Sequence, residues 1–417
     1  MRVEVINTGT ELLLGQVVNT HLAYFGDRLF ELEMRVERQV AVPDGEAIGV
    51  ALEAAFEEGA EVVMVTGGLG PTSDDLTREI TAGLFGVELD LDEAVLEHIE
   101  ARFRRRAGRV MPPENRRQAM VPRGAEVLWN PNGTAPGLYF PAAGERPHVF
   151  LLPGPPRELR PMFDDKVMPK LREIAGEAEA RGCRNYRIVG VGESDLAENL
   201  EPRLREIGGL EIGYCTRYGE VDVRCIGAFG ELEKAEAVVR SVYGDELVSA
   251  RGEEMEEVIV SLLVDKGETL ATAESCTGGT IANAITNVPG ASAVFLAGLV
   301  TYANEAKVEF LGVDGATIEA KGAVSPEVAS AMVAGCRART GATHAISVTG
   351  IAGPGGGSEE KPVGTVYVGL ASEGADIFLR RLYYETDRET FKRVVARTAM
   401  DLLRRRMLGI ALPGGAG

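Results

Sequence analysis

A strand–helix alternation, repeated in the first and last parts of the chain, constrains the fold more than any other feature. In the first part, apolar runs of strand length cover residues 3–7, 60–65 and 148–152, and residues 35–42 alternate as a further strand. Between these strands, apolar residues recur at helical spacing, as at Ile48, Leu52 and Phe56. Asn19 is the expected N-cap of another such helix. Such alternation predicts parallel strands with helices on both faces. From about Gly252 the pattern repeats and ends in a helix over residues 388–407. We therefore predict the α/β class with two α/β sheet domains.

A smaller unit is expected between these two domains. A charged stretch of low apolar content, residues 173–182, predicts a boundary. Beyond it, strand patterns cover residues 183–191, 210–215 and 220–228, and helical patterns cover residues 194–207 and 231–243. A second boundary is expected near Gly252. The prediction is three domains: residues 1–172, a small α+β domain over residues 173–251, and residues 252–417.

Composition excludes several classes of protein. Lys and Arg number 44 and Asp and Glu number 63, a net charge of −19, which opposes non-specific binding to DNA or anionic lipid. No apolar run approaches the roughly 18 residues of a membrane helix. The first residues lack the pattern of a secretion signal. Five Cys, an odd number in a long chain, do not form a disulfide framework. A reducing cytoplasm fits best, so we expect a cytoplasmic protein with no membrane partner.

One local cluster has the opposite sign. It consists of Arg102, Arg104, Arg105, Arg106, Arg109, Arg116 and Arg117. Two interpretations stay open: a solvated helix face, or a rim that steers phosphates into a nearby cleft.

Three Gly- or Pro-rich loops follow expected strands of the first domain: residues 8–15, 66–75 and 153–158. Because ligands bind at the carboxyl ends of parallel strands, we expect the loops to converge on one site. Gly67, Gly68 and Gly70 allow the backbone to cradle phosphate oxygens, and Thr72 offers a hydroxyl. Asp74 and Asp75 are expected at a helix start. There they either favour the helix dipole or hold a divalent cation against a pyrophosphate.

The last domain has its own cluster in ESCTGG, which follows the expected strand over residues 269–273. Ser275 is expected at a strand-to-helix turn, where backbone amides can form an oxyanion hole and Gly278 and Gly279 permit close approach. Ser275 or Thr277 can instead be a simple N-cap. Cys276 is either a rival nucleophile or a buried structural thiol.

A nucleophile needs a base, and histidine is scarce. Only His344 lies beyond Gly252, and its surroundings predict a buried strand, so a Ser–His–Asp triad is poorly supported. Lys307, with Tyr302, follows the apolar run over residues 293–300 at another strand end. A desolvated lysine can accept a proton, although a surface lysine on a helix fits the same sequence. Thr349 and Gly350 are expected at this edge too.

These blocks resemble the CinA family over nearly the whole chain. The matching motifs are TGTELLLGQVVNT, TGGLGPTSDDLT, NGTAPG, PGPPRE, AESCTGG, TYANEAK, GAVS and TGIAGPGGGSEEKPVGTV. The resemblance implies a molybdopterin-binding fold like that of MogA in the first domain, associated with metal-dependent hydrolysis of ADP-ribose. It implies a KH-like middle domain. It also implies a last domain that deamidates nicotinamide mononucleotide without a metal.

The resemblance also implies residue roles. In the last domain, Ser275 is the nucleophile, Lys307 its partner, and Tyr302, Thr349 and the pair Asp387–Arg388 lie near substrate. Substrate contacts there include Cys276, Thr277, Gly278, Gly279, Gly350 and Arg388. In the first domain the expected substrate contacts are Glu11, Asp44, Gly67, Gly68, Gly70, Thr72, Asp74, Gly133, Thr134 and Gly154. The expected ligands of a divalent metal ion, Mg²⁺ or a transition metal, are Asp75 and Glu158.

Two positions depart from the family pattern: His21, where many relatives carry Asn, and Gly45, where many carry Asp. Both put the pyrophosphatase activity in more doubt than deamidation. One alternative is therefore a deamidase whose first domain only binds a nucleotide or pterin. Another is a competence-related nucleic-acid-binding protein, which the net charge opposes. A homodimer is expected, with nicotinamide mononucleotide and ADP-ribose as small-molecule partners.

Overall fold

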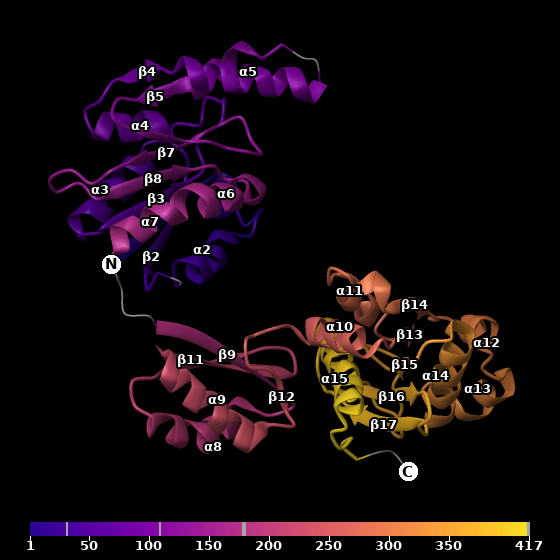
Figure 1. Cartoon of the computed structure of the whole chain (residues 1–417). Coiled ribbons are helices and arrows are strands. Elements are labelled where there is room, and N and C mark those ends of the chain that lie inside the picture. The colour runs from indigo at the N-terminus through magenta and orange to yellow at the C-terminus, as the bar shows by residue number, and fades with distance from the viewer. Residues whose placement is uncertain (31, 108–109, 177–180, 415–417) are drawn as a thin grey trace. The chain divides into compact units, whose positions relative to one another are not determined.

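The computed structural model describes residues 1–30, 32–107, 110–176 and 181–414. The chain divides into two compact units, Met1–Ala180 and Arg181–Gly417 (Figure 1). Within the described residues, no helix is both long enough and apolar enough to cross a membrane. The second unit contains the predicted last domain and, from Arg181 on, the predicted middle domain, and the division into three domains stays a prediction.

The first unit is built on a six-stranded sheet with the order β2-β1-β3-β8-β7-β6. Its strands are β1 (Arg2–Thr8), β2 (Arg35–Val42), β3 (Val62–Thr66), β6 (Glu126–Leu128), β7 (Gly137–Phe140) and β8 (His148–Leu152). Strands β2, β1, β3 and β8 are parallel, as predicted, whereas β7 and β6 are antiparallel additions. Central strand β3 is buried throughout because its alternate residues face two separate cores, Val63 and Val65 on one side and Val62 and Met64 on the other.

Helices cover both faces of this sheet (Figure 1). They are α1 (Thr10–Leu13), α2 (His21–Phe30), α3 (Ala47–Glu57), α4 (Thr77–Leu84), α5 (Glu93–Ala107), α6 (Pro156–Met162) and α7 (Met168–Ala175). Shorter elements are the 3₁₀ helix η1 (Pro113–Ala119), the π-turn η2 (Phe163–Val167) and the small antiparallel pair β4 (Leu89–Leu91) and β5 (Met120–Pro122). The helix α2 begins at His21, so Asn19 lies one residue before the N-cap position that was predicted for it, although its side-chain oxygen accepts from the His21 amide at 2.9 Å.

The second unit begins with a four-stranded antiparallel sheet of order β10-β11-β9-β12. Its elements are β9 (Arg181–Val189), α8 (Glu193–Arg205), β10 (Glu211–Thr216), β11 (Glu220–Ala228), α9 (Phe229–Tyr243) and β12 (Leu247–Ser249). The expected pairing of β10 with β11 is confirmed. The two helices bury one apolar face against the sheet through Leu200, Leu232 and Val239. The KH-like character of this part stays a prediction.

A five-stranded sheet of order β14-β13-β15-β16-β17 forms the rest of the second unit. Its strands are β13 (Leu270–Glu274), β14 (Phe295–Val300), β15 (His344–Gly350), β16 (Thr365–Ser372) and β17 (Phe378–Tyr383). Strands β14, β13 and β15 are parallel, so their carboxyl ends share one edge. Strands β16 and β17 are antiparallel, which the strand–helix alternation did not predict.

Two helical layers enclose this second sheet (Figure 1). One layer holds α10 (Met255–Lys266), α11 (Thr280–Thr286) and α15 (Arg388–Leu408), and the other holds α12 (Asn304–Leu311), α13 (Gly315–Lys321) and α14 (Pro326–Thr340). The short 3₁₀ helix η3 (Ala291–Ala293) precedes β14. Each helix buries an apolar stripe against the sheet, which leaves the carboxyl edge of the parallel strands for polar residues.

Candidate active sites

Ser275 lies at the carboxyl edge of the parallel strands of the second unit. It follows β13, and its amide donates to the Val348 carbonyl of β15 at 2.9 Å. On the other side of β13, the amide of Thr301, directly after β14, donates to the Glu274 carbonyl at 2.9 Å. The segments that carry Ser275, Tyr302 and Thr349 therefore end neighbouring strands, which confirms that the three predicted loops meet at one edge.

Lys307 is on helix α12, but the surface interpretation is wrong. Its side chain is only 1% exposed, and its Nζ donates to the carbonyl oxygens of Thr301 at 3.0 Å and Tyr302 at 3.2 Å. Burial lowers the pKa of Lys307 below the usual value of a lysine, although Cys276 and Glu305 oppose the shift. An amine whose pKa is depressed is neutral more often at physiological pH and can accept a proton.

Cys276 is a buried thiol. Burial raises its pKa to about 12, with Glu274 acting in the same direction and Lys307 opposing it. A thiol with this pKa stays protonated at neutral pH, and only the thiolate is a good nucleophile. The Lys307 Nζ bonds to the Thr301 carbonyl, and the Thr301 amide bonds to the Glu274 carbonyl, so the lysine amine lies beside the strand end that carries Ser275. This favours Ser275 over Cys276 as nucleophile.

Glu274 shapes the turn, and the sequence reasoning missed it. Its buried carboxylate accepts three backbone hydrogen bonds: from Gly279 at 3.0 Å, Ile281 at 3.1 Å and Ala282 at 2.8 Å. The charge therefore compensates the positive amino end of α11 and closes the ESCTGG loop on itself. No local capping pattern signals this, because Glu274 is the last residue of a strand and the helix begins several residues later.

Changing Glu274→Gln is expected to destabilise this unit by about 2 kcal/mol, because a neutral amide replaces an anion that accepts three amide bonds. The midpoint of thermal unfolding should fall by roughly 4 to 8 °C. Calorimetry of the full-length protein measures it. The matched control is Glu319→Gln, an exposed glutamate of α13. Equal midpoints for the Glu274→Gln variant and the unchanged protein would contradict the capping role.

The candidate oxyanion donors are fewer than expected. The Gly278 amide already donates to the Ser275 carbonyl at 3.1 Å, and the Gly279 amide to Glu274. Within the described residues, the amides of Cys276 and Thr277 donate to no backbone carbonyl, although both face the Cys276 sulfur and lower the pKa of that thiol against the effect of burial. These two amides are the remaining candidates. Gly278 and Gly279 have φ values of 62° and 94°, which explains why glycines stand there.

Other predicted residues at this edge have structural partners. The Thr349 hydroxyl donates to the Ala323 carbonyl at 2.8 Å, so it is not a free oxyanion donor. A Cβ on Gly350 would meet the Val366 side chain at 2.8 Å, which shows that close strand packing alone requires the glycine. Asp387 caps α15 by accepting from the amides of Glu389 and Thr390.

Arg388 and Tyr302 come together at this edge. The Arg388 guanidinium donates to the Tyr302 hydroxyl at 2.6 Å and to the Gly353 carbonyl at 2.7 Å. Both side chains are exposed, so they remain accessible to a ligand. His344 lies instead at the first residue of β15, bonded to Ser372 at 2.8 Å and Glu268 at 2.9 Å. It is the satisfied core imidazole that the sequence predicts, and no Ser–His–Asp triad can include it.

The predicted loops of the first unit enclose one pocket of about 380 Å³. Its lining includes Glu11, Asp44, Gly67, Gly68, Gly70, Asp74, Asp75, Thr134, Gly154 and Glu158. The convergence of the three loops is therefore confirmed, and the roles of these residues stay predictions. Two expected contacts, Thr72 and Gly133, are not among the lining residues. The Thr72 amide donates to the Asp75 carboxylate at 2.9 Å, and the Gly133 amide to the Asn130 side chain at 2.7 Å.

The two carboxylates expected to bind metal are already hydrogen-bonded. Thr72 holds Asp75, and the Asn130 amide group donates to Glu158 at 2.9 Å. Among the described residues, no group of three or more His, Cys, Asp or Glu side chains is arranged to hold a metal ion. The metal-binding roles of Asp75 and Glu158 stay predictions, and a cation there would need further ligands such as phosphate oxygens.

The turn before α4 differs from expectation. The helix begins at Thr77, so Asp74 and Asp75 precede it, and hydrogen bonding from Thr72 lowers the pKa of Asp74. Arg117, which the sequence left as part of either a solvated helix face or a phosphate-steering rim, holds this turn. It donates to the carbonyl oxygens of Thr72 and Asp75 and to Glu79 at 2.9 Å. Arg109 and the side chain of Arg106 lie outside the described residues.

The two departures from the family pattern have distinct surroundings. His21 is buried, and its Nε2 lies 2.8 Å from the Gly154 carbonyl, so it supports a loop that lines the pocket. Gly45 has a φ of 104°, a conformation that suits glycine, beside Asp44. Asp44 accepts from the Thr8 hydroxyl at 2.7 Å. The pocket wall is therefore complete despite both departures.

The family model for the CinA C-terminal domain matches residues 252–407, and the model "Probable molybdopterin binding domain" matches residues 4–173. A CinA-like protein of Akkermansia muciniphila is 48% identical over 400 residues, 96% of each chain. The chain belongs to the CinA family.

Other relatives agree. A CinA-like protein of Citrifermentans bemidjiense is 42% identical over the full length of both chains. A crystal structure of a competence/damage-inducible protein from Agrobacterium tumefaciens is 41% identical, with a TM-score of 0.36. It covers 36% of this chain and 92% of its own. The resemblance predicted from the motifs is confirmed as membership of the family, with a match to the CinA C-terminal domain and, in the first part of the chain, to a probable molybdopterin binding domain.

Proposed function

We propose that this protein is a bifunctional hydrolase of NAD-derived nucleotides. Its CinA C-terminal domain would convert nicotinamide mononucleotide and water to nicotinate mononucleotide and ammonia. Its first domain would hydrolyse the pyrophosphate bond of ADP-ribose. The observation that carries the proposal is the buried Lys307 amine, which bonds to the Thr301 carbonyl beside the strand end that presents Ser275. Burial also lowers the pKa of this amine.

In the amidase reaction, neutral Lys307 accepts the Ser275 proton as the serine oxygen attacks the carboxamide carbon. The amides of Cys276 and Thr277 then stabilise the oxyanion, and one such donor is typically worth about 3 to 4 kcal/mol in the transition state. Lys307 returns the proton to the leaving nitrogen, which departs as ammonia. Water then hydrolyses the acyl-enzyme. Arg388, exposed at the same edge, is the candidate to pair with the substrate phosphate.

In the first domain, the glycine-rich loop over residues 66–70 would cradle the pyrophosphate with its backbone amides. Asp75 and Glu158 would hold a divalent cation together with phosphate oxygens, and such a cation neutralises charge on the pyrophosphate. Arg117 keeps the turn that bears Asp75 in place. Asp44 and Glu11 line the same pocket as candidate contacts for the ribose hydroxyls.

A product assay on both substrates tests the proposal. With chelator, ADP-ribose hydrolysis should fall at least about a hundred-fold because a charge-neutralising cation is removed, while ammonia release from nicotinamide mononucleotide persists. The Asp75→Asn variant should reproduce the chelator effect without added chelator. Its matched control is Asp90→Asn, an exposed aspartate of β4. Equal sensitivity of both activities to chelator would contradict the proposal that only ADP-ribose hydrolysis needs a metal ion.

A second candidate, in which the first domain binds a nucleotide or pterin without turnover, has specific support. The molybdopterin-binding family model covers residues 4–173, and the described residues contain no preformed metal cluster. Equilibrium binding of ADP-ribose to the full-length protein with added Mg²⁺, and no product after prolonged incubation, would favour this candidate.

A further inference from the structure

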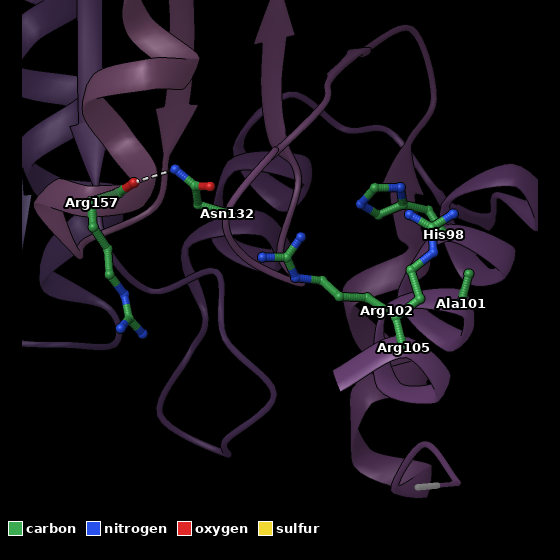
Figure 2. Close-up of a pocket in the computed structure, with 6 residues that line it drawn as sticks. All are labelled: His98, Ala101, Arg102, Arg105, Asn132 and Arg157. Carbon is green, nitrogen blue, oxygen red and sulfur yellow. Dashed lines mark hydrogen bonds between the residues drawn. The ribbon is translucent and has the colours of Figure 1, made fainter. Parts of the chain in front are cut away.

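A second pocket of the first unit is strongly basic. It measures about 430 Å³ and is lined by His98, Ala101, Arg102, Arg105, Asn132 and Arg157 (Figure 2). Three guanidinium groups therefore border one hollow, and no carboxylate lines it. Figure 2 shows that the side chains come from α5 on one side and from the loop of Asn132 and the start of α6 on the other. In a chain with a net charge of −19, such a concentration of positive charge needs a cause.

The arginines on α5 that line this pocket are not neutralised by the protein. Arg102 donates to the Pro131 carbonyl at 2.9 Å, and neither Arg102 nor Arg105 forms an ion pair with a described residue. Arg104, on the same helix, behaves differently, since it pairs with Glu100 at 3.6 Å. Arg157 approaches only Glu158, at 3.9 Å.

Two buried nitrogens at this pocket also lack partners. The Nε of Arg102 and the Nε2 of His98 are inaccessible to solvent and bond to no other described atom. Burial, followed by the charge of Arg102, lowers the pKa of His98, so at neutral pH its imidazole is uncharged. Of these two nitrogens only the Arg102 Nε is a donor without an acceptor, which is unfavourable unless a ligand or water supplies one, because the neutral His98 ring already bonds to the Asn130 backbone.

This basic pocket is separate from the pocket of about 380 Å³ that Gly67, Gly68 and Gly70 line, which we call the glycine-loop pocket. The same two segments contribute residues to both pockets. Asn132 of the basic pocket lies two residues before Thr134 of the glycine-loop pocket, and Arg157 directly precedes Glu158. The Asn132 amide group donates to the Arg157 carbonyl at 2.9 Å and joins the loop of Asn132 to the start of α6 (Figure 2).

We propose that the basic pocket binds a phosphate or pyrophosphate group of a small molecule, as a second anion site next to the glycine-loop pocket. Guanidinium groups match phosphate oxygens with paired, charge-assisted hydrogen bonds, and the Asn132 side chain offers a further polar group. The site goes beyond the proposed activities and does not depend on either of them.

Titration of the full-length protein with inorganic pyrophosphate tests this site. Calorimetry gives the affinity, and the fluorescence of Trp129, the only tryptophan of the chain, reports the location because its ring lies 5.2 Å from that of His98. Arg102→Gln and Arg105→Gln should each weaken binding about ten-fold or more, since each removes charged hydrogen bonds. Arg105 is exposed, so its variant tests the site even if Arg102→Gln folds poorly. A parallel titration uses adenosine monophosphate, a phosphate ester. Tighter binding of this ester than of inorganic pyrophosphate would show that the pocket takes the phosphate group of a larger molecule, and tighter binding of pyrophosphate would show that it takes the free anion.

The matched control is Arg104→Gln, which removes the same charge from the same helix and should change the affinity less than about two-fold. An equal loss in Arg104→Gln would reveal only general electrostatic attraction and would overturn the site. Unchanged affinity in both Arg102→Gln and Arg105→Gln would also overturn it. Asp44→Asn alters the glycine-loop pocket and should leave the Trp129 response intact. If that response disappears, the ion binds in the glycine-loop pocket instead.

Discussion

The Ser275→Ala variant is expected to lose hydrolysis of nicotinamide mononucleotide by at least about a thousand-fold in kcat, because removing a nucleophile leaves only binding and oxyanion stabilisation. The substitution deletes one oxygen from a side chain that is 9% exposed, so the fold should persist. Ammonia release under saturating substrate measures the loss. Hydrolysis of ADP-ribose by the same preparation should be unaffected and shows that the protein is intact.

Two further variants make this result specific. Ser292→Ala makes the same chemical change at an exposed serine of η3 and should retain full activity. Cys276→Ala should lower kcat far less than Ser275→Ala, because burial raises the pKa of the thiol to about 12 and keeps it protonated. The reverse result, with Cys276→Ala inactive and Ser275→Ala active, would show that Cys276 is the nucleophile.

Lys307→Met is expected to lower kcat of the amidase by about 10² to 10⁴, the usual contribution of a general base. Methionine fills a similar volume without burying a charge, so packing of α12 is kept. Lys307→Arg should not restore the rate, because a guanidinium stays protonated and cannot act as a base. Lys321→Met, an exposed lysine of α13, is the matched control.

The pH dependence gives the same assignment a separate test. Burial lowers the pKa of Lys307, and only the neutral amine accepts a proton. The kcat/KM of the amidase should therefore rise with pH as Lys307 loses its proton, and fall as pH drops below its lowered pKa. In Lys307→Met this rise of kcat/KM with pH should disappear. An identical pH profile in the variant would show that another group titrates.

The positions of the site loops were determined by the sequence itself. Apolar periodicity located β13, β14 and β15, and parallel strands end at a common edge, so Ser275, Tyr302 and Thr349 were expected together. The glycine loop around Gly67 was found in the same way. These signals are local: each depends on residues adjacent in the chain and on turn chemistry that a short segment encodes.

Other features were decided only by tertiary structure. Whether Lys307 is a base or a surface residue depends on how α12 packs against the sheet, since burial sets its pKa. Arg388 reaches Tyr302 across 86 positions of sequence, and Arg117 reaches Asp75 across 42. The antiparallel edges formed by β7 and by β16 likewise depend on long-range pairing. Hydrophobic periodicity reports which side of an element is apolar, but not what that side meets, so desolvation and long-range hydrogen bonds appear only once the chain is folded.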